Sequence, residues 1–536
     1  MFSLMENYKK RWAGLDDYLP PSAGVNRVGR NMANYFFFQA LMRHGTFDEY
    51  HFFLANDAHR RLFADVHGPF LSSIGVSKKI VLRDRLELAD KAVLNDFTVV
   101  HLNDHISLFN AVCRLRNAAG SQVPVTSFIH SISYADHMNK YLEMSLAGAS
   151  HNDAIICSSE CGKRVVLRCF DKISDRLSVP RAKTKLEVIP LGIDEIPAPL
   201  DRQKARSQFN FLDNQVVALC FGRFSDFDKM DLFPLLQAFK HAANNNSKLV
   251  LAGAVHEETY FKMVQLWTKA LGLSEQVEFV IDPCEEQKRL LYSAADFFVS
   301  VADNPQETFG LTPLEAMAAR LPLIVSDFDG YRELCSDDVG FRVPTAWCDL
   351  QELDALQAIM DGRTFHRLAA QSISVDVLAL ADAMKKLFED TALRAKMSVA
   401  SRARFEAYYS HKKTIGRLER LWDTLKTDFE PLPQTDDPLS LNISDTFSHY
   451  VTRQINLDDK VRISSFGKEF LANNFSYPLL SNINDLIVSG DIDKAMKRAV
   501  KPTIIKTLCQ TFDQPTWKTR YLVMWMLKHE LLELVD

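Results

Sequence analysis

The chain has 536 residues, a formal net charge of −5 and ordinary shares of apolar (47%) and charged (24%) residues, which exclude a mainly disordered or collagen-like protein. With 63 Lys and Arg against 68 Asp and Glu, it has no strong basic field to hold a nucleic-acid backbone. Its length is too great for one hydrophobic core and predicts about three domains.

Short apolar runs alternate with stretches of helical spacing in the first part of the chain. Such runs are typical of strands that are buried on both faces of a parallel sheet. The predicted strands are 50–54, 98–102, 125–129, 154–157 and 186–189, with helical spacing at 30–43 and 107–116. This alternation predicts a Rossmann-like α/β domain over residues 1–196.

The same pattern restarts in the middle of the chain. Strands are predicted at 215–221, 248–251, 277–281, 297–301 and 323–325, with a helix at 232–243. They define a second Rossmann-like α/β domain over residues 197–395. Two such domains in tandem leave a cleft between the carboxyl ends of their sheets, which is where α/β sheets bind ligands.

The rest of the chain is predicted to be helical. Residues 396–428 form one or two long helices, and the prolines of 429–438 mark a linker. Residues 439–536 form a helical tail domain, in which 453–470 and 520–534 are amphipathic. An apolar face on such a tail favours a core or dimer contact over an acceptor or membrane contact.

Cysteine usage and hydropathy bear on the compartment. The 9 cysteines include no C-x-x-C pair, so they indicate free thiols in a reducing compartment rather than a zinc site. No apolar run approaches the ~18 residues of a membrane span, and the first residues lack the order of a signal peptide. We expect a cytoplasmic protein and leave peripheral membrane contact open.

The most informative segment runs from Glu307 to Ala318. We expect a capping box at its helix start, with Thr312 as N-cap and Glu315 three residues later. Gly310 lets the backbone approach a ligand closely, and the free amides of a helix start suit a phosphate. The carboxylate of Glu315 is then available to accept hydrogen bonds from ribose hydroxyls. The alternative is that Glu315 is a capping residue only. For Glu307 the alternative is a solvated loop acid.

A second candidate site follows the first strand of the second domain. Arg223 and Lys229 lie six residues apart on a strand–helix loop and suit a diphosphate, since Arg grips two oxygens and Lys supplies a point charge. A solvated loop is the alternative when this segment is taken alone. The pairs Asp226-x-Asp228 and Asp327-x-Asp329 mimic a metal-binding pattern that is common by chance, so no metal site is expected.

These segments resemble the retaining GT-B glycosyltransferases of family 4. The resemblance rests on Gly222-Arg223 with Lys229 and on Glu307-x7-Glu315 around Phe309-Gly310-Leu311. Weaker matches are the runs Val188 to Asp194, Cys157 to Glu160 and Gly330 to Glu333. It covers residues 15–428. Arg320, Asp329 and Leu191 depart from the family pattern, and none of the three removes a charged group that the chemistry needs.

The resemblance implies roles for residues of the second domain. Arg223 and Lys229 would hold the donor diphosphate. Glu307, with the amides around Phe309, Gly310 and Leu311, would hold the donor sugar and phosphate, and Glu315 would bind the ribose hydroxyls.

In the first domain, Gly24 matches a glycine of the family's loop that lies over the donor phosphates and the acceptor. His130, at a strand end, matches the histidine near the donor sugar. His101 and His105 end another strand and compete for this role, and a structural histidine is the alternative for each.

The resemblance therefore implies a retaining, metal-independent glycosyltransferase of the hexosyltransferase type. It would move a sugar from a nucleotide diphosphate-sugar to a glycan, a lipid-linked or a protein acceptor, without a cofactor. The alternatives are a catalytically silent GT-B scaffold and a GT-B-like epimerase. The sequence leaves open the sugar, the base, the acceptor, the role of 439–536 and self-association through that tail.

Overall fold

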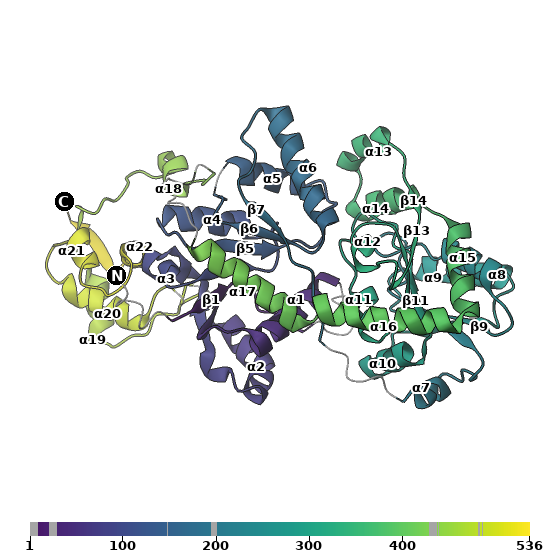
Figure 1. Ribbon diagram of the computed structural model, residues 1–536. Coiled ribbons are helices and arrows are strands. Elements are labelled where there is room, and N and C mark those ends of the chain that lie inside the picture. The colour runs from purple at the N-terminus through teal and green to yellow at the C-terminus, as the bar shows by residue number, and fades with distance from the viewer. Residues whose placement is uncertain are drawn as a thin grey trace.

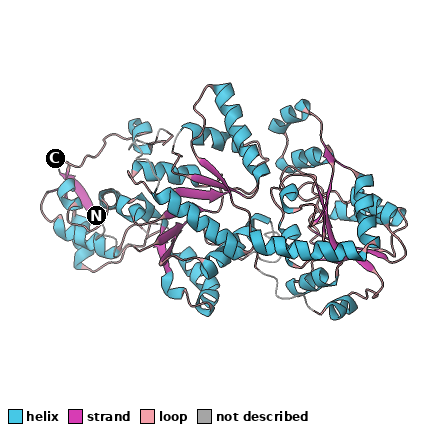
Figure 2. Cartoon of the chain, viewed as in Figure 1, coloured by secondary structure: helices cyan, strands magenta, loops and turns pink. Residues whose placement is uncertain are grey.

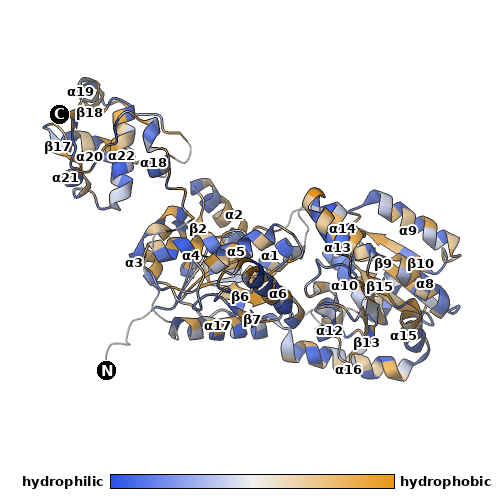
Figure 3. Ribbon diagram, turned by 90° about the horizontal axis from the view of Figure 1, so that it is seen from above, coloured by the Kyte–Doolittle hydropathy of each residue, from blue (hydrophilic) through white to orange (hydrophobic). Residues whose placement is uncertain are grey.

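The computed structural model describes residues 9–20, 29–146, 148–194, 201–427, 437, 439–480, 483–484 and 486–535. Two α/β domains lie side by side, and a smaller third domain lies beyond the first (Figure 1). The same order is seen from above, where the small domain stands apart from the other two (Figure 3). The predicted 429–438 linker lies almost wholly outside the described residues.

The first domain is a seven-stranded parallel sheet in the order β3-β2-β1-β4-β5-β6-β7. Its strands are β1 (Arg11–Gly14), β2 (Glu49–Leu54), β3 (Ile80–Asp84), β4 (Val99–Leu102), β5 (Val125–Phe128), β6 (Ala154–Cys157) and β7 (Lys185–Val188). Its helices are α1 (Gly29–His44), α2 (Asp57–Ser73), α3 (Lys91–Asn95), α4 (Phe109–Ala118), α5 (His137–Leu146) and α6 (Glu160–Leu177). They cover both faces of the sheet, which the colouring by secondary structure makes plain (Figure 2).

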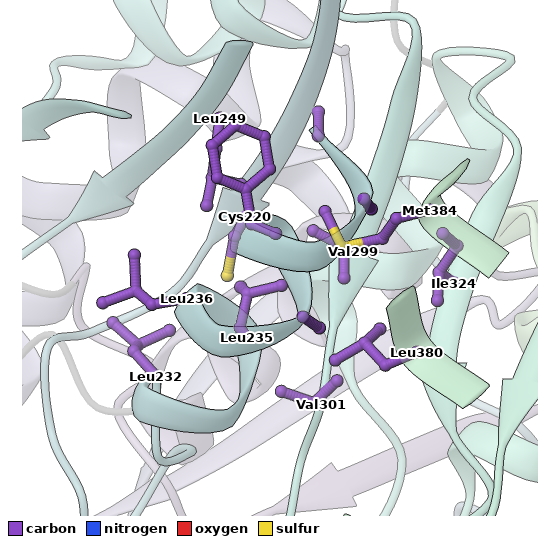
Figure 4. Packing of buried hydrophobic residues seen from close by; sticks show 14 of the residues in the cluster. Cys220, Leu232, Leu235, Leu236, Leu249, Val299, Val301, Ile324, Leu380 and Met384 are labelled. Atoms are coloured by element: carbon purple, nitrogen blue, oxygen red, sulfur yellow. The ribbon is translucent and has the colours of Figure 1, made fainter. Parts of the chain in front are cut away.

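The second domain is a six-stranded parallel sheet in the order β10-β9-β8-β11-β12-β13. Its strands are β8 (Val216–Phe221), β9 (Ser247–Gly253), β10 (Val277–Ile281), β11 (Phe297–Ser300), β12 (Leu323–Ser326) and β13 (Gly340–Val343), with a short pair β14 (Thr345–Ala346) and β15 (Ser374–Val375). Its helices are α7 (Arg202–Gln208), α8 (Phe233–Ala242), α9 (Glu258–Ala270), α10 (Glu285–Ala294), α11 (Leu311–Ala318), α12 (Tyr331–Leu334), α13 (Gln351–Leu356), α14 (Gly362–Gln371) and α15 (Val377–Glu389). Leu235 of α8 and Met384 of α15 pack with Leu249 and Val299 of the strands in its core (Figure 4).

The ten predicted strands all form, within one or two residues of the predicted bounds. Three strands of the two sheets were missed. β3 and β13 are edge strands in which Arg83 and Asp84, and Gly340 and Arg342, interrupt the apolar pattern. β1 is central but only four residues long, and it starts with Arg11.

Two long helices cross from the second domain to the first. α16 (Thr391–Tyr408) packs on α11, and α17 (His411–Thr427) packs on α1. Trp422 of α17 is fully buried in the aromatic core of the first domain, with ring centroids 5.8 Å from Phe47 and 5.4 Å from His101. Its Nε1 donates to Thr126 Oγ1 at 3.1 Å. α17 thus completes the first domain's core from the far end of the sequence.

The tail domain corrects one expectation. Its helices are α18 (Ile443–Thr446), α19 (Ser465–Ala472), α20 (Ser489–Arg498), α21 (Ile505–Cys509) and α22 (Thr516–Lys528), but β16 (Lys460–Ile463), β17 (Thr503–Ile504) and β18 (Leu532–Val535) add an antiparallel sheet. The predicted helix over 520–534 is therefore wrong at its end, because the chain turns at Glu530 with a φ of 57° and continues as β18. Alternating burial on β16, with Val461 and Ile463 inside, identifies a half-buried strand.

We expect Trp422→Ala to destabilise the first domain by about 3–5 kcal/mol, since it removes a buried indole and leaves a cavity. The measurement is the urea midpoint of the first unfolding transition, followed by near-UV circular dichroism. Trp347→Ala is the control, because Trp347 is 54% exposed. An equal shift for both variants would contradict the proposed role of α17.

Candidate active site

A cavity of about 630 Å³ lies between the first and second domains. The first domain contributes Arg30, Phe36, Asp104, Ser107, His130 and Tyr134 to its lining. The second domain contributes residues that follow its strands, among them Arg223, Lys229, Glu307, Phe309, Gly310, Leu311 and Glu315. The structure therefore brings the predicted residues of both domains together in one cavity. Gly24 lies outside the described residues.

The start of α11 forms one wall. Its N-cap is Gly310, whose φ of 97° is strained for any other residue, and a Cβ there would lie 2.3 Å from the Tyr331 ring. The first amides of a helix have no intrahelical partner, and the positive end of its dipole favours an anion. Since no side chain caps this start, the wall is suited to a phosphate oxygen.

The predicted capping box at Thr312 and Glu315 is wrong. The helix begins two residues earlier than expected, so Thr312 lies within its first turn. The carboxylate of Glu315 turns to the neighbouring α10, where it accepts from Lys288 Nζ at 2.5 Å and from Tyr292 OH at 2.9 Å. These two partners hold it at the cavity wall, where a carboxylate accepts hydroxyl donors.

Lys229 and Glu307 form an ion pair at the cavity wall. Lys229 Nζ donates to Glu307 Oε2 at 2.9 Å and to Tyr331 OH at 3.3 Å. Burial acts to raise the pKa of Glu307, but the Lys229 ammonium and the amides of Phe309 and Thr308 hold this pKa below its ordinary value. Burial likewise opposes the charge on Lys229, and Glu307 overcomes this and raises the pKa of the lysine. Both side chains are therefore charged at neutral pH.

Arg223 extends from the loop after β8. Its Nη2 lies 3.2 Å from Asp228 Oδ2, and Asp226 of the same loop pairs with Arg367 of α14 at 2.9 Å. The two acids of the Asp226-x-Asp228 pattern thus have different arginine partners. Among the described residues, no group of three or more His, Cys, Asp or Glu side chains is placed to hold a metal ion.

Of the three candidate histidines, only His130 lines the cavity. Its Nε2 lies 2.7 Å from Asn103 O and 3.0 Å from Asn34 Oδ1, and burial lowers its pKa to about 4, so the ring is neutral at pH 7. His101 and His105 are fully buried, against Thr126 Oγ1 at 2.9 Å and Tyr141 OH at 3.0 Å. Their positions fit a structural role.

Sequence reasoning missed the residues that support the charged groups. Tyr331 holds Lys229 through its hydroxyl, which also lies 3.0 Å from Ser300 Oγ. Lys288 and Tyr292 hold Glu315. Tyr331 lies in a motif that the sequence did single out, but its contacts join β11 and the loop after β8, and only the folded chain brings these together.

Comparisons with known proteins identify the family model and the relatives that this chain matches. Residues 201–364 match the family described as Glycosyl transferases group 1. The D-inositol 3-phosphate glycosyltransferase of Xylanimonas cellulosilytica is 30% identical over 233 residues, which cover 41% of this chain and 51% of that protein. The phosphatidyl-myo-inositol mannosyltransferase of Mycobacterium leprae is 24% identical over 340 residues, which cover 62% of this chain and 75% of that protein. This chain thus spans only about half the length of the first of these relatives.

The solved structure of Anabaena HepE in complex with UDP has a TM-score of 0.52 and 16% identity, over 77% of this chain and 98% of that one. Two parallel-sheet domains that face one cleft, joined by crossing helices, are the GT-B fold. The chain therefore has the GT-B fold, and the match to the glycosyl transferases group 1 family lies in its second domain.

His101 generates a prediction about acid stability. Burial lowers its pKa from 6.5 to about 3, so the unfolded chain binds a proton between these pH values that the folded chain does not. Stability therefore falls as the pH drops from 6.5 towards 3, by up to ~1.4 kcal/mol per pH unit from this residue. We expect His101→Phe to flatten that slope in urea denaturation series at pH 6.5, 5.5 and 4.5. An unchanged slope would contradict a buried neutral His101.

Proposed function

We propose that the chain is a retaining, metal-independent glycosyltransferase, which moves a sugar from a nucleotide diphosphate-sugar to a glycan, a lipid-linked or a protein acceptor. The observation that carries this proposal is the single cavity in which Arg223, Lys229, Glu307 and the start of α11 face His130 of the other domain. The cations Arg223 and Lys229, the acids Glu307 and Glu315, and an anion-binding helix start match a donor with a diphosphate, a ribose and a sugar.

The phosphate-binding groups account for departure of the leaving group. A nucleoside diphosphate leaves readily if its developing negative charge is stabilised, and fixed cations and helix amides do this without reorganisation. In the proposed reaction Arg223, Lys229 and the first amides of α11 take this role. Because Asp226 and Asp228 are committed to arginines, the proposal assigns no metal to them.

Glu307 acts on the sugar in this proposal. When the donor phosphates bind Lys229, the carboxylate is released from part of its ion pair and faces the sugar. It orients the hydroxyls and supports the positive charge that develops as the glycosidic bond breaks. No enzyme nucleophile is needed, because the acceptor attacks from the face that the diphosphate leaves, which retains the configuration.

The acceptor would enter from the first domain's side. Arg30, Asp104 and His130 line this side of the cavity, and a further cavity of about 290 Å³, lined by Asp16, Asn34 and Asp104 among others, adjoins it. Among the described residues, no helix is long and apolar enough to cross a membrane. The two curated relatives named above act, by their names, on inositol-containing acceptors, and this supports a hydroxyl-rich acceptor.

Nucleotide binding tests the donor site first. In a thermal-shift screen with UDP, GDP and ADP, we expect at least one to stabilise the protein, by ~2.7 kcal/mol at 100 times its Kd. Arg223→Ala should lose most of this stabilisation. Arg202→Ala is the matched control, since Arg202 pairs with Asp296 away from the cavity. If no nucleotide stabilises the wild type, the donor site is refuted.

Glu307→Gln tests the chemistry. The variant keeps the shape of the side chain but removes the charge, so we expect kcat for sugar transfer and for donor hydrolysis to fall by roughly 10²-fold or more. The assay is run in EDTA, because the proposed reaction uses no metal. Glu406→Gln, which breaks an ion pair with Arg402 on α16, is the control. Unchanged turnover in Glu307→Gln would contradict the role proposed for Glu307, whereas absent turnover in the wild type would favour a silent scaffold.

A further inference from the structure

Two motifs contain residues to which the reaction proposed above assigns no role, namely Cys157 to Glu160 in the first domain and Gly330 to Glu333 in the second. The fold places them against each other across the cleft. Ser159 Oγ donates to Thr308 O at 2.9 Å, and Ser158 Oγ reaches the same oxygen at 3.3 Å. Thr308 directly follows Glu307, so hydroxyls of the first domain bind the backbone of the loop that carries this acid.

Glu333 makes the reverse contact, from the second domain to the first. Its Oε2 accepts from the amide of Glu160 at 2.9 Å and its Oε1 from the amide of Cys161 at 3.0 Å. These are the first amides of α6, a helix of 18 residues. A carboxylate at a helix start satisfies orphan donors and interacts favourably with the helix dipole, so this contact is a charge-assisted one between the domains.

Gly330 allows this approach. A Cβ at this position would lie 2.6 Å from Thr308 O and 3.2 Å from Ser159 Cβ. Its φ is negative, so backbone conformation does not require glycine here. The absence of a side chain is what lets Ser159 reach the 307–309 loop.

The other side of Glu307 is held in the same way. Gln306 Nε2 donates to Ser131 Oγ at 3.2 Å and to Tyr134 OH at 3.3 Å, both in the loop that follows His130. The residues immediately before and after Glu307 are therefore both bound by the first domain. Within the second domain, Lys229 donates to the carboxylate of Glu307 and fixes it.

We propose that Ser159, Gln306 and Glu333 are positioning residues for Glu307, because their contacts between the two domains hold the loop that carries this acid. The proposal rests on the function proposed above. It makes the orientation of the acid depend on contact with the acceptor-side domain, so that an open cleft holds the donor phosphates but leaves Glu307 poorly aligned for bond cleavage.

Steady-state kinetics of Ser159→Ala and Glu333→Ala separate positioning from binding. Since Arg223 and Lys229 are untouched, the donor KM should stay within about twofold while kcat falls roughly 10-fold or more. Ser159 also caps α6 through the amide of Gly162 at 3.0 Å, so loss of a cap must be controlled. Two variants serve as controls. Asn56→Ala, which removes the cap of α2 in the same domain, is the control for Ser159→Ala, and Glu406→Ala, which removes an exposed acid of α16, is the control for Glu333→Ala.

Hydrogen exchange gives a readout that is independent of activity. In Glu333→Ala, the segment with the amides of Glu160 and Cys161 should exchange roughly 10-fold faster than in the wild type, while the core strand β6 is unchanged. Unchanged exchange together with unchanged kcat would overturn the proposal. If instead the wild type neither binds UDP or GDP nor turns over a donor, the proposed function fails, while exchange still reports whether the contact exists.

Discussion

The ion pair between Lys229 and Glu307 is the interaction on which the arrangement of the cavity depends. Both groups are largely removed from solvent, with exposed side-chain fractions of 11% and 17%, and such charges are costly unless each keeps a partner. The pair needs the loop after β8, the loop after β11 and Tyr331 of α12 at one place. The parallel sheet provides this, because the carboxyl ends of its strands meet at one edge.

The same pair explains why the cavity must be covered. An ammonium and a carboxylate attract each other weakly in a water-filled cleft, whereas their attraction is much stronger in a cavity of low polarity. The first domain supplies the cover with Arg30, His130 and Tyr134, and burial keeps His130 neutral by lowering its pKa to about 4. A neutral imidazole adds no positive charge of its own to the site, and Arg30 and Lys288 of the lining are paired with Asp104 and Glu315. In the proposed donor complex the diphosphate therefore binds Arg223, Lys229 and the start of α11.

Much of the fold and of the candidate site was predictable because both depend on local patterns. Short apolar runs identified the strands, and the spacing of Arg223, Lys229, Glu307 and Glu315 identified the cavity wall. The capping box was wrong because Thr312 and Glu315 fit a local rule that Gly310 and the partners of Glu315 on α10 override. The strand β18 was missed because the turn at Glu530, rather than the pattern of the strand itself, ends the helix before it. Contacts between domains, such as that of Gln306 with Tyr134, leave no periodic signal.

The two chain crossings between the domains are joined to each other. The segment that enters the second domain and the junction of α16 with α17 are joined, since the amide of Ile193 donates to Tyr409 O and the amide of His411 donates to Ile193 O, each at 3.1 Å. His411 Nδ1 lies 2.8 Å from Asp194 Oδ1 and helps to lower the pKa of that acid to about 2. These bonds join both crossings at one point, so the relative placement of the two domains depends on this junction. Tyr409 of the junction also donates from its hydroxyl to Glu333 O at 3.4 Å, so the residue whose carboxylate binds the start of α6 is itself held at the junction.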